Sequence, residues 1–489
     1  MRKKWLAALA LLAWCGRGSA GAPKDAKSVV DDVARALGAS GVNTVQYSGH
    51  GLFYQFGQSY LPNGPYPRFH MKYSRALDFG KNLSQEEIVR TQFENPPRGG
   101  GGQPLYREAR AVTVTAENSA WGGGAATLTP HGWVMAAMAA NPTMKSTTVE
   151  GKRMTIVSFT VGEKYRVNGY VDSENLPEKV ETWMPNPILG DTLVETEYSG
   201  YKDFGGTKFP MKISQKIGAF PVLELNVDNV EINAPTKIDA PRPPQSAVPP
   251  AAHVESQKIA EGVWYLAGTP EPNSMAVEFT DYVVLIESSF TEGRALANIA
   301  EAKRLAPGKP IRYHLNSHHH SDHAAGLRTY VAEGSIIITH KMNKPFYEQV
   351  VLKNPHTLDP DDLSKHPKAA KFIWVRDKYA LSDGDRSLEI YAVRDAGHTA
   401  NLLMAYLPKE KLLFITDIFN QFGEPRPNDP PPGIVTPYYA ALGDNLKRLN
   451  LGVQEIAPSH GKGVVSVELL RKALEGTVQA PSVVPPSGN

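Results

Sequence analysis

The feature that most constrains this chain is a cluster of histidines between His314 and His323. Five of the fourteen histidines fall in this window, whose centre reads His318-x-His320-x-Asp322-His323. Neutral imidazole and carboxylate groups are the side chains that bind zinc-like cations. Alternate residues of an extended segment point to one side, so His318 and His320 can reach one metal ion. Asp322 and His323 follow a turn and can face a second ion beside the first.

Three further candidate ligands follow downstream, each where an apolar strand gives way to a loop. His398 lies in a Gly-His-Thr turn, Asp417 follows the run KLLFIT, and His460 follows EIAPS. Loops at the edge of a rigid sheet are where proteins usually place ligating side chains. Singly, each residue could be a turn residue, a helix cap or a surface side chain. A solvated His-rich loop is the alternative for the first cluster, but the ordered set favours a two-metal site.

This ordered set resembles the ligand motifs of the metallo-β-lactamase superfamily, over roughly Val254 to Val478. The resemblance implies a C-terminal four-layer αβ/βα sandwich with metal ions at one edge of the paired sheets. One departure is visible, because the supporting acidic residue of the family's early strand is usually Asp and here is Glu287. The implied ligands are His318, His320 and His398 for the first ion, Asp322, His323 and His460 for the second, and Asp417 as the bridge between them.

The ligand set predicts a metal-dependent hydrolase with two metal ions per chain, zinc being expected and iron or manganese being the alternatives. Two adjacent ions lower the pKa of a shared water molecule and generate a bridging hydroxide near neutral pH. We expect that hydroxide to attack the carbonyl of a lactone, ester or amide, with Asp322 as the catalytic residue that orients it. No serine or cysteine nucleophile is required.

The patterns of this family reduce the number of substrate classes to consider. The only cysteine, Cys15, lies in the expected leader, which excludes the cysteine ligand of some β-lactamases. The complete bridge at Asp417 is more similar to glyoxalase-type and acyl-lactone hydrolases. A lactone or ester hydrolase is therefore the first hypothesis, a periplasmic β-lactamase the second and a persulfide dioxygenase-type iron enzyme the third. An envelope binding or transport protein with a structural metal site stays open as a different class.

Three loops are expected to rim the metals, at 268–276, 341–385 and 420–439. They carry aromatic and apolar residues, which indicates a small-molecule substrate with hydrophobic character. The formal net charge is +2, and residues 1–20 carry four positive charges and no negative one, so the remaining chain is near −2. Without a Lys/Arg-rich run, no nucleic-acid partner is expected. The sequence does not define the oligomeric state.

The first residues indicate export. A basic MRKK, a short apolar stretch and the small residues GRGSA predict a signal peptide cut after Ala20, and hence a periplasmic or secreted protein. The apolar stretch is too short for a membrane span and no other stretch qualifies, so no transmembrane segment is expected. Loss of Cys15 would leave a chain without disulfides.

At 489 residues the chain should contain more than one domain, and its fold class is predicted as α+β with two domains. A Pro-rich segment marks the boundary between them. The predicted organisation is a signal peptide at 1–20, a β-rich half-barrel-like domain at 24–232, a Pro-rich linker at 233–256, the metallohydrolase domain at 257–478 and a disordered tail at 479–489.

The first domain reads as a helix near 25–38 followed by an antiparallel meander whose strands begin near Ala111. The run from Gly169 to Gln215 is similar to the half-barrel domains of periplasmic lipoprotein carriers. Such a domain could cradle an acyl chain, and the alternative is a module that packs on or positions the hydrolase. The glycine runs at 98–103 and 121–126 predict mobile loops.

Local patterns near the histidine cluster complete the prediction. An amphipathic helix is expected over 292–305, with Leu296, Ile299 and Ala302 on one face. His314 should be a packed structural histidine, and His319 should point away from the ligands on either side of it.

Overall fold

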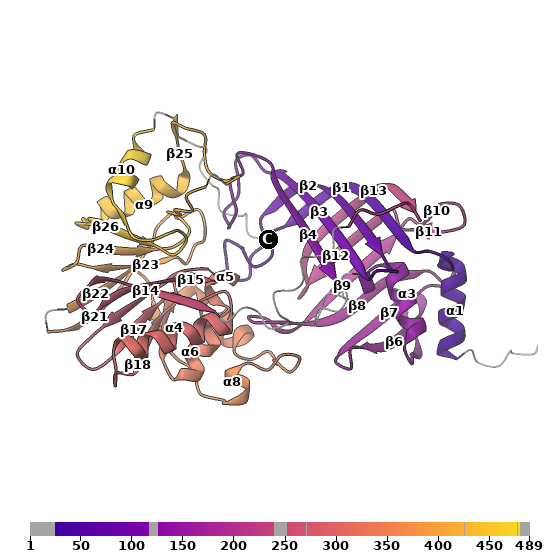
Figure 1. Ribbon diagram of the computed structural model, residues 1–489, viewed down its shortest axis with the longest axis horizontal. Coiled ribbons are helices and arrows are strands. Elements are labelled where there is room, and N and C mark those ends of the chain that lie inside the picture. Colours follow the sequence, from indigo (N-terminus) through magenta and orange to yellow (C-terminus); the bar gives the residue numbers. More distant parts are fainter. Residues whose placement is uncertain are drawn as a thin grey trace, which may run out of the picture.

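The structure, a computed structural model, describes residues 25–116, 126–238, 252–269, 271–384, 386–424, 426–476 and 478–479. The chain forms two domains that lie side by side and contact each other (Figure 1). The signal peptide predicted at 1–20, most of the glycine run at 121–126 and the end of the predicted tail lie outside the described residues. Among the helices that are described, none is long and apolar enough to cross a membrane.

The N-terminal domain is built on one antiparallel sheet of eleven strands, which confirms the expected β-rich module. Strand β9 and much of β13 bury alternate side chains as the sequence predicts, whereas β6, β7 and β8 each bury two or three consecutive residues. In sheet order the strands are β4 (Ala109–Ala116), β3 (Leu83–Gln92), β2 (Arg68–Asp78), β1 (Thr44–Tyr54), β13 (Phe220–Ile232), β12 (Lys212–Ile217), β9 (Gly190–Ser199), β8 (Pro177–Asn186), β7 (Tyr165–Val171), β6 (Lys152–Val161) and β5 (Thr143–Val149). A small hairpin, β10 (Lys202–Asp203) with β11 (Lys208–Phe209), stands apart.

Two helices pack against this sheet and close the first core. Helix α1 (Ala26–Leu37) begins at Asp25, whose side chain accepts a hydrogen bond from the Ser28 N–H, and ends at the left-handed Gly38. Helix α3 (Pro130–Ala139) buries Trp133 in the same cluster of apolar side chains. The strands β1 to β3 and helix α3 were not expected from the sequence. Strand β3 is mostly polar and α3 is apolar on all sides, whereas β2 buries alternate residues and was missed in spite of that pattern.

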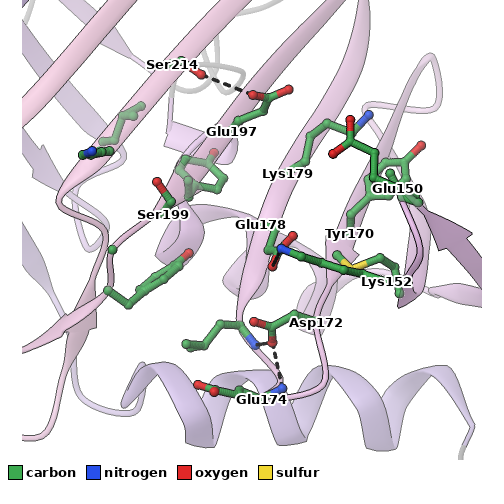
Figure 2. A pocket seen from close by; sticks show the side chains of 18 of the residues that line it. Glu150, Lys152, Tyr170, Asp172, Glu174, Glu178, Lys179, Glu197, Ser199 and Ser214 are labelled. Atoms are coloured by element: carbon green, nitrogen blue, oxygen red, sulfur yellow. Dashed lines mark hydrogen bonds and ion pairs between the residues drawn. The ribbon is translucent and has the colours of Figure 1, made fainter.

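A cavity of about 860 Å³ lies against β6–β9, β12 and β13 of the N-terminal domain. Nine of its twenty-one lining residues are charged, among them Lys152, Asp172, Lys179 and Glu197 (Figure 2). Covering charged groups with hydrocarbon is unfavourable. This lining therefore does not favour the acyl-chain cradle that the sequence left open.

The C-terminal domain contains two mixed sheets. The first is β14 (His253–Ala260), β15 (Val263–Thr269), β16 (Ser274–Glu278), β17 (Val283–Ile286), β18 (Ile311–Leu315), β19 (Ile336–His340) and β20 (Lys371–Val375). The second is β21 (Lys378–Asp383), β22 (Arg386–Ala392), β23 (Leu403–Leu407), β24 (Leu412–Ile415), β26 (Glu455–Pro458) and β27 (Val465–Ser466). Strand β14 begins inside the range expected for the linker. A separate short pair is β25 (Ile434–Val435) with β28 (Val478–Gln479).

Alternating side chains give this domain four layers, as the resemblance predicts. In β17, Val283 and Leu285 face a core with helices α4 (Glu292–Leu305) and α6 (Leu327–Glu333), whereas Val284 and Ile286 face the second sheet. Beyond that sheet, α9 (Pro437–Arg448) and α10 (Glu468–Leu474) close the last core. The α+β fold with a C-terminal αβ/βα sandwich is therefore confirmed.

The prediction for the buried face of helix α4 was wrong in one residue. Its bounds agree with the predicted 292–305, but Leu296 is 44% exposed instead of facing the core. The buried face is formed by Ala295, Ile299 and Ala302, at a spacing of four and three residues. Leu296 lies one residue, or about 100°, away from that stripe.

Candidate metal centre

The seven candidate ligands converge at one edge of the two C-terminal sheets. The loop after β18 and the short helix α5 (Ser321–Ala324) supply four of them. The turn between β22 and β23 and the loops that follow β24 and β26 supply one each. They form two groups, each with ligand atoms within 4.8 Å of one another: His318, His320 and His398 in the first, and Asp322, His323, Asp417 and His460 in the second.

The first group consists of three buried imidazoles whose rings lie close together. The rings of His318 and His320 have centroids 4.4 Å apart, and those of His320 and His398 are 4.5 Å apart. In each ring one buried nitrogen has no hydrogen-bond partner within the described part of the chain. These atoms are Nε2 of His318, Nδ1 of His320 and Nε2 of His398. Buried polar atoms are rarely left unpaired, so three that face one another fit a metal ion.

The second group consists of two carboxylates and two imidazoles that face one another. The Nε2 atom of His323 lies 3.2 Å from Asp322 Oδ2 and 3.0 Å from Asp417 Oδ2. The Nε2 atom of His460 lies 3.6 Å from Asp322 Oδ2 and 3.3 Å from Asp417 Oδ1. The two Nε2 atoms are 3.2 Å apart. Two nitrogens and two carboxylates aimed at one point form a donor set that suits a divalent transition metal.

Asp417 joins the two groups. Besides its contacts in the second group, its Oδ2 atom lies 3.4 Å from Nε2 of His318 and 3.4 Å from Nε2 of His398. The residue has a backbone φ of +60°, a left-handed conformation that non-glycine residues adopt at a cost. Functional sites are where such strained conformations gather. The side chain thereby stands between the two clusters.

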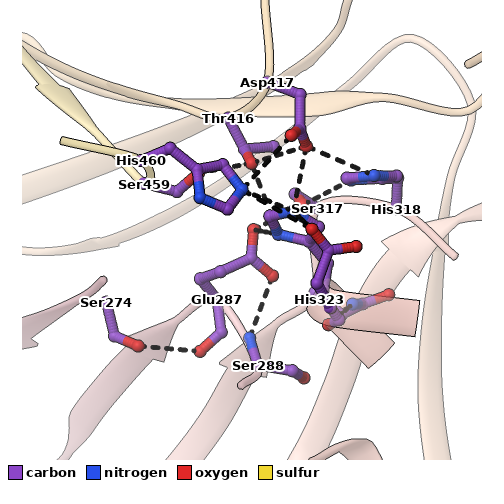
Figure 3. A network of polar contacts seen from close by, with 12 residues as sticks. Ser274, Glu287, Ser288, Ser317, His318, His323, Thr416, Asp417, Ser459 and His460 are labelled. Carbon is purple, nitrogen blue, oxygen red and sulfur yellow. Dashed lines mark hydrogen bonds and ion pairs between the residues drawn. The ribbon is translucent and has the colours of Figure 1, made fainter. Parts of the chain in front are cut away.

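Hydrogen bonds from Glu287 and Ser317 orient these ligands from behind (Figure 3). Buried Glu287 lies with Oε2 3.1 Å from His323 Nδ1 and accepts hydrogen bonds from Ser317 Oγ and the Ser288 N–H. Ser317 Oγ lies 2.9 Å from Nδ1 of His318. Outer partners of this kind fix the tautomer and direction of a metal-binding imidazole. Glu287 therefore stands where the resemblance placed a supporting acid, with the longer side chain.

The histidines of the two groups differ in the direction of their pKa shifts. Burial and neighbouring imidazoles hold the pKa of His318 and that of His320 well below the usual range, so both rings are neutral. Burial also disfavours charge on His323 and His460, but the facing carboxylates outweigh it and raise their pKa values, that of His460 to about 9. In the second group the carboxylates thus favour protonated imidazoles. A cation that binds there displaces protons.

Two of the three loops expected at the rim contribute side chains to it. Glu271 Oε2, from 268–276, lies 3.3 Å from Nδ1 of His460. The Phe422 ring, from 420–439, has its centroid 5.7 Å from that of His460. From 341–385, Tyr347 lies beneath the site instead of at its rim, because it is fully buried, with its O–H 2.5 Å from Asn316 Oδ1. The side chains placed at the rim are therefore Glu271 and Phe422, and the Arg426 guanidinium packs over the Phe422 ring.

Two residues of the N-terminal domain reach the same place, and sequence reasoning missed both. The Nε2 atom of Gln58 donates a hydrogen bond of 2.8 Å to Asp322 Oδ1. The backbone oxygen of Ser59 lies 2.7 Å from Nε2 of His320. Both residues belong to a loop after β1 without a metal-binding pattern, so no local signal in the sequence indicates them.

The histidines set aside as structural are placed as expected. His314 is buried, stacks on Tyr330 with ring centroids 3.6 Å apart, and lies with Nε2 2.7 Å from Ser288 Oγ. His319 lies between two ligands but hydrogen-bonds to Asn401 and Ser59 instead of joining either group.

Fold and site together define a metal-binding domain of the kind that supports metal-dependent hydrolysis. Residues 268–460 match the family model of the metallo-beta-lactamase superfamily, which confirms the resemblance expected from the ligand motifs. The C-terminal part of the chain is thus identified as a domain of that superfamily.

Solved structures similar to this chain include three metallo-beta-lactamases. The enzyme from Pontibacter korlensis is 17% identical over 46% of this chain and 97% of its own, with a TM-score of 0.35. FIM-1 from Pseudomonas aeruginosa, in its mono-zinc form, is 19% identical over 46% of this chain and 94% of its own, with a TM-score of 0.34. The metallo-beta-lactamase from Hirschia baltica is 21% identical over 47% of this chain and 99% of its own, with a TM-score of 0.34. No curated protein matches the chain.

Proposed function

We propose that this protein is a dinuclear metal-dependent hydrolase, periplasmic or secreted, that attacks the carbonyl group of a lactone, ester or amide. The family match and the two His/Asp groups support metal-dependent hydrolysis. Zinc is the metal we assign, because five imidazoles and two carboxylates are the donors that zinc binds. The assignment to the periplasm rests on the sequence of residues 1–20.

The observation that carries this proposal is the position of Asp417. Its carboxylate lies 3.0–3.4 Å from ring nitrogens of both groups. A single carboxylate in that place can contribute one ligand to each of two ions. A structural metal site would need only one closed group of four ligands, so two joined groups favour a catalytic centre over a structural one.

The ions would acidify a water molecule and polarise the carbonyl oxygen of the substrate. The side chain of Asp322 is 25% exposed, whereas those of His323, Asp417 and His460 are at most 10% exposed. Asp322 is therefore the carboxylate of the second group that meets solvent and substrate. We assign to it the role of orienting the attacking water.

The rim supports a substrate with hydrophobic character. Phe422 is partly exposed beside His460, and the buried Tyr438 ring lies 5.7 Å from the ring of His398. Glu271 adds a negative charge on the His460 side, and the Arg426 guanidinium over the Phe422 ring adds a positive one. We favour a lactone or ester with an apolar substituent, which can lie against the aromatic faces of this surface.

A proton-release assay tests the proposal directly. The zinc-loaded chain, its Asp417→Asn variant and a metal-stripped sample would be offered acyl lactones of graded chain length, a penicillin and a carbapenem. Lactone turnover that requires both metal and Asp417 would support the proposal. Turnover of the β-lactams alone would favour the β-lactamase hypothesis instead.

Metal content separates the enzyme from a binding protein with a structural metal site. A chain that holds two ions yet hydrolyses none of these substrates would refute lactone and ester hydrolysis. A chain that holds a single ion, with no change in Asp417→Asn, would refute the dinuclear centre.

A further inference from the structure

We propose that the N-terminal domain is a working part of the metal centre, because a loop of that domain positions two of the metal ligands. The docking loop, defined here as residues 57–60, follows strand β1 and lies against the loop after β18. The proposal rests on the metal centre of the proposed function. It assigns positioning roles to Gln58, through its side chain, and to Ser59, through its backbone.

Gln58 acts on the second group through Asp322. Its amide nitrogen donates to Asp322 Oδ1 at 2.8 Å, while Oδ2 of the same carboxylate faces His323 and His460. One oxygen is thereby held by the docking loop and the other is left for a metal ion. A carboxylate anchored in this way presents a single oxygen in a fixed direction, and such outer partners strengthen metal binding.

Ser59 acts on the first group through His320. Its backbone oxygen lies 2.7 Å from Nε2 of His320, so that nitrogen carries the proton and donates it. The other ring nitrogen, Nδ1, then keeps its lone pair and is the atom without a partner that faces His318 and His398. The docking loop therefore selects the tautomer that can bind metal.

Several further hydrogen bonds hold the docking loop in place. Its backbone oxygens at Gly57 and Tyr60 accept from the N–H groups of Ser321 and Ala400, at 3.1 Å and 3.0 Å. Ser321 immediately precedes Asp322, and Ala400 lies two residues after His398. The loop thus contacts both segments that carry the first group.

The glycine run at 98–103, which the sequence predicted as mobile, is instead part of this contact. The Gly100 N–H donates to the backbone oxygen of Gly397, and the Gly101 N–H donates to that of Gln58. A Cβ atom at Gly101 would lie 1.8 Å from the Gln58 side-chain oxygen. Glycine is needed here for close approach, not for mobility.

The interface between the two domains offers one variant that tests Gln58 and one that serves as its control. Gln58→Met keeps the length of the side chain and removes the donor to Asp322. Asp191→Asn weakens the same domain interface at a distant point, where the Asp191 carboxylate accepts from Thr357 and from the Leu358 N–H. In chelator competition on the full chain, Gln58→Met should lower the affinity of the second zinc by about 10–100-fold. Asp191→Asn should change neither zinc affinity.

Gly57 allows a separate test of the Ser59 contact. Gly57 has a φ of +76°, and a Cβ atom there would lie 2.6 Å from Ser321 Oγ and 2.8 Å from Ser321 Cβ. Gly57→Ala should push the loop from His320 and weaken the first zinc site, and Ser321→Gly should restore it by removing the clashing atoms. Gly41→Ala has a similar φ of +78° with no atom within 4 Å, so it controls for backbone strain.

The cobalt(II) form supplies a second readout, because visible absorption bands report the ligand geometry of each site. Altered bands in Gln58→Met and Gly57→Ala, with normal bands in both controls, would support positioning by the docking loop. Unchanged zinc affinities and spectra in both loop variants would overturn it. An affinity loss in Gly57→Ala that Ser321→Gly does not repair, or that Gly41→Ala reproduces, would also overturn it. If the unmodified chain bound fewer than two ions, the proposed function itself would fail instead.

Discussion

Replacing Glu287 tests whether the outer hydrogen bonds control the metal centre. Glu287 is fully buried, and its carboxylate faces His323 Nδ1 at 3.1 Å, Ser317 Oγ at 2.5 Å and the Ser288 N–H at 2.9 Å. Glu287→Gln preserves the size and shape of the side chain. However, it removes the charge and replaces one acceptor by an amide that donates, which conflicts with at least one of these three donors.

The size of the effect follows from these contacts. A hydrogen bond to a charged group contributes about 1.5–3 kcal/mol, and one to a neutral group about 0.5–1.5 kcal/mol. If the His323 contact alone is weakened, the second metal ion should bind with about 1.4 kcal/mol less free energy, or roughly tenfold less tightly. Glu287→Ala leaves all three donors unpaired and should weaken binding by a further factor of about ten.

Zinc titration against a competing chelator measures this effect, with unfolding of the metal-free chain followed in parallel. The affinity for the first ion should change less than that for the second, because Glu287 touches His323 directly and His318 only through Ser317. Equal affinities in Glu287→Gln and the unmodified chain would refute the reasoning. Restoration of wild-type affinity by Glu287→Asp, the residue usual in the family, would show that charge matters more than length.

Three other predictions address the bridge and the N-terminal core. Asp417→Asn should reduce the metal content from two ions to one and lower turnover by at least about 100-fold, measured by elemental analysis and proton release; full content would contradict the bridge. Gly169→Ala places a Cβ atom 2.1 Å from the buried Trp133 ring and should destabilise the chain by about 3 kcal/mol in urea, with turnover per folded molecule unchanged. Burial lowers the pKa of His131 to about 4 in the folded chain. As the pH falls below about 6.5, this histidine is therefore protonated in the unfolded chain but stays neutral in the folded chain, which destabilises the fold. Between pH 7 and pH 5, the His131→Phe variant should lose about 2 kcal/mol less stability than the unmodified chain. Identical pH profiles would show that His131 does not set acid sensitivity.

Much of the C-terminal domain was predictable because its signals are local. Continuous apolar runs in β15 and β17 define strands that are buried on both faces, and two buried faces require layers on both sides. Each ligand follows a strand end or lies in a short turn, so residue type and order along the chain were enough to collect all seven in one hypothesis. The helix at 327–333 ends at Gly334, which takes the left-handed conformation usual for a glycine that follows a helix.

The N-terminal domain was less predictable because its signals are weak. Strand β3 contains mostly polar residues that are half-buried, so it shows little alternation. Helix α3 is apolar around its circumference and lacks a periodic stripe. These elements are stabilised by their places in an eleven-stranded sheet and its core, which are contacts between segments far apart in the chain.

Residue type and order along the chain were therefore enough to predict the ligand set and the four-layered C-terminal domain, and they led to the hypothesis of metal-dependent hydrolysis. The contact between Gln58 and Asp322, 264 residues apart in the chain, and the packing of the glycine run emerge only when the two domains dock. Propensity and periodicity depend on neighbours along the chain, whereas docking depends on the shapes of two folded surfaces. No periodic pattern encodes which loop of one domain will fit against the metal ligands of the other.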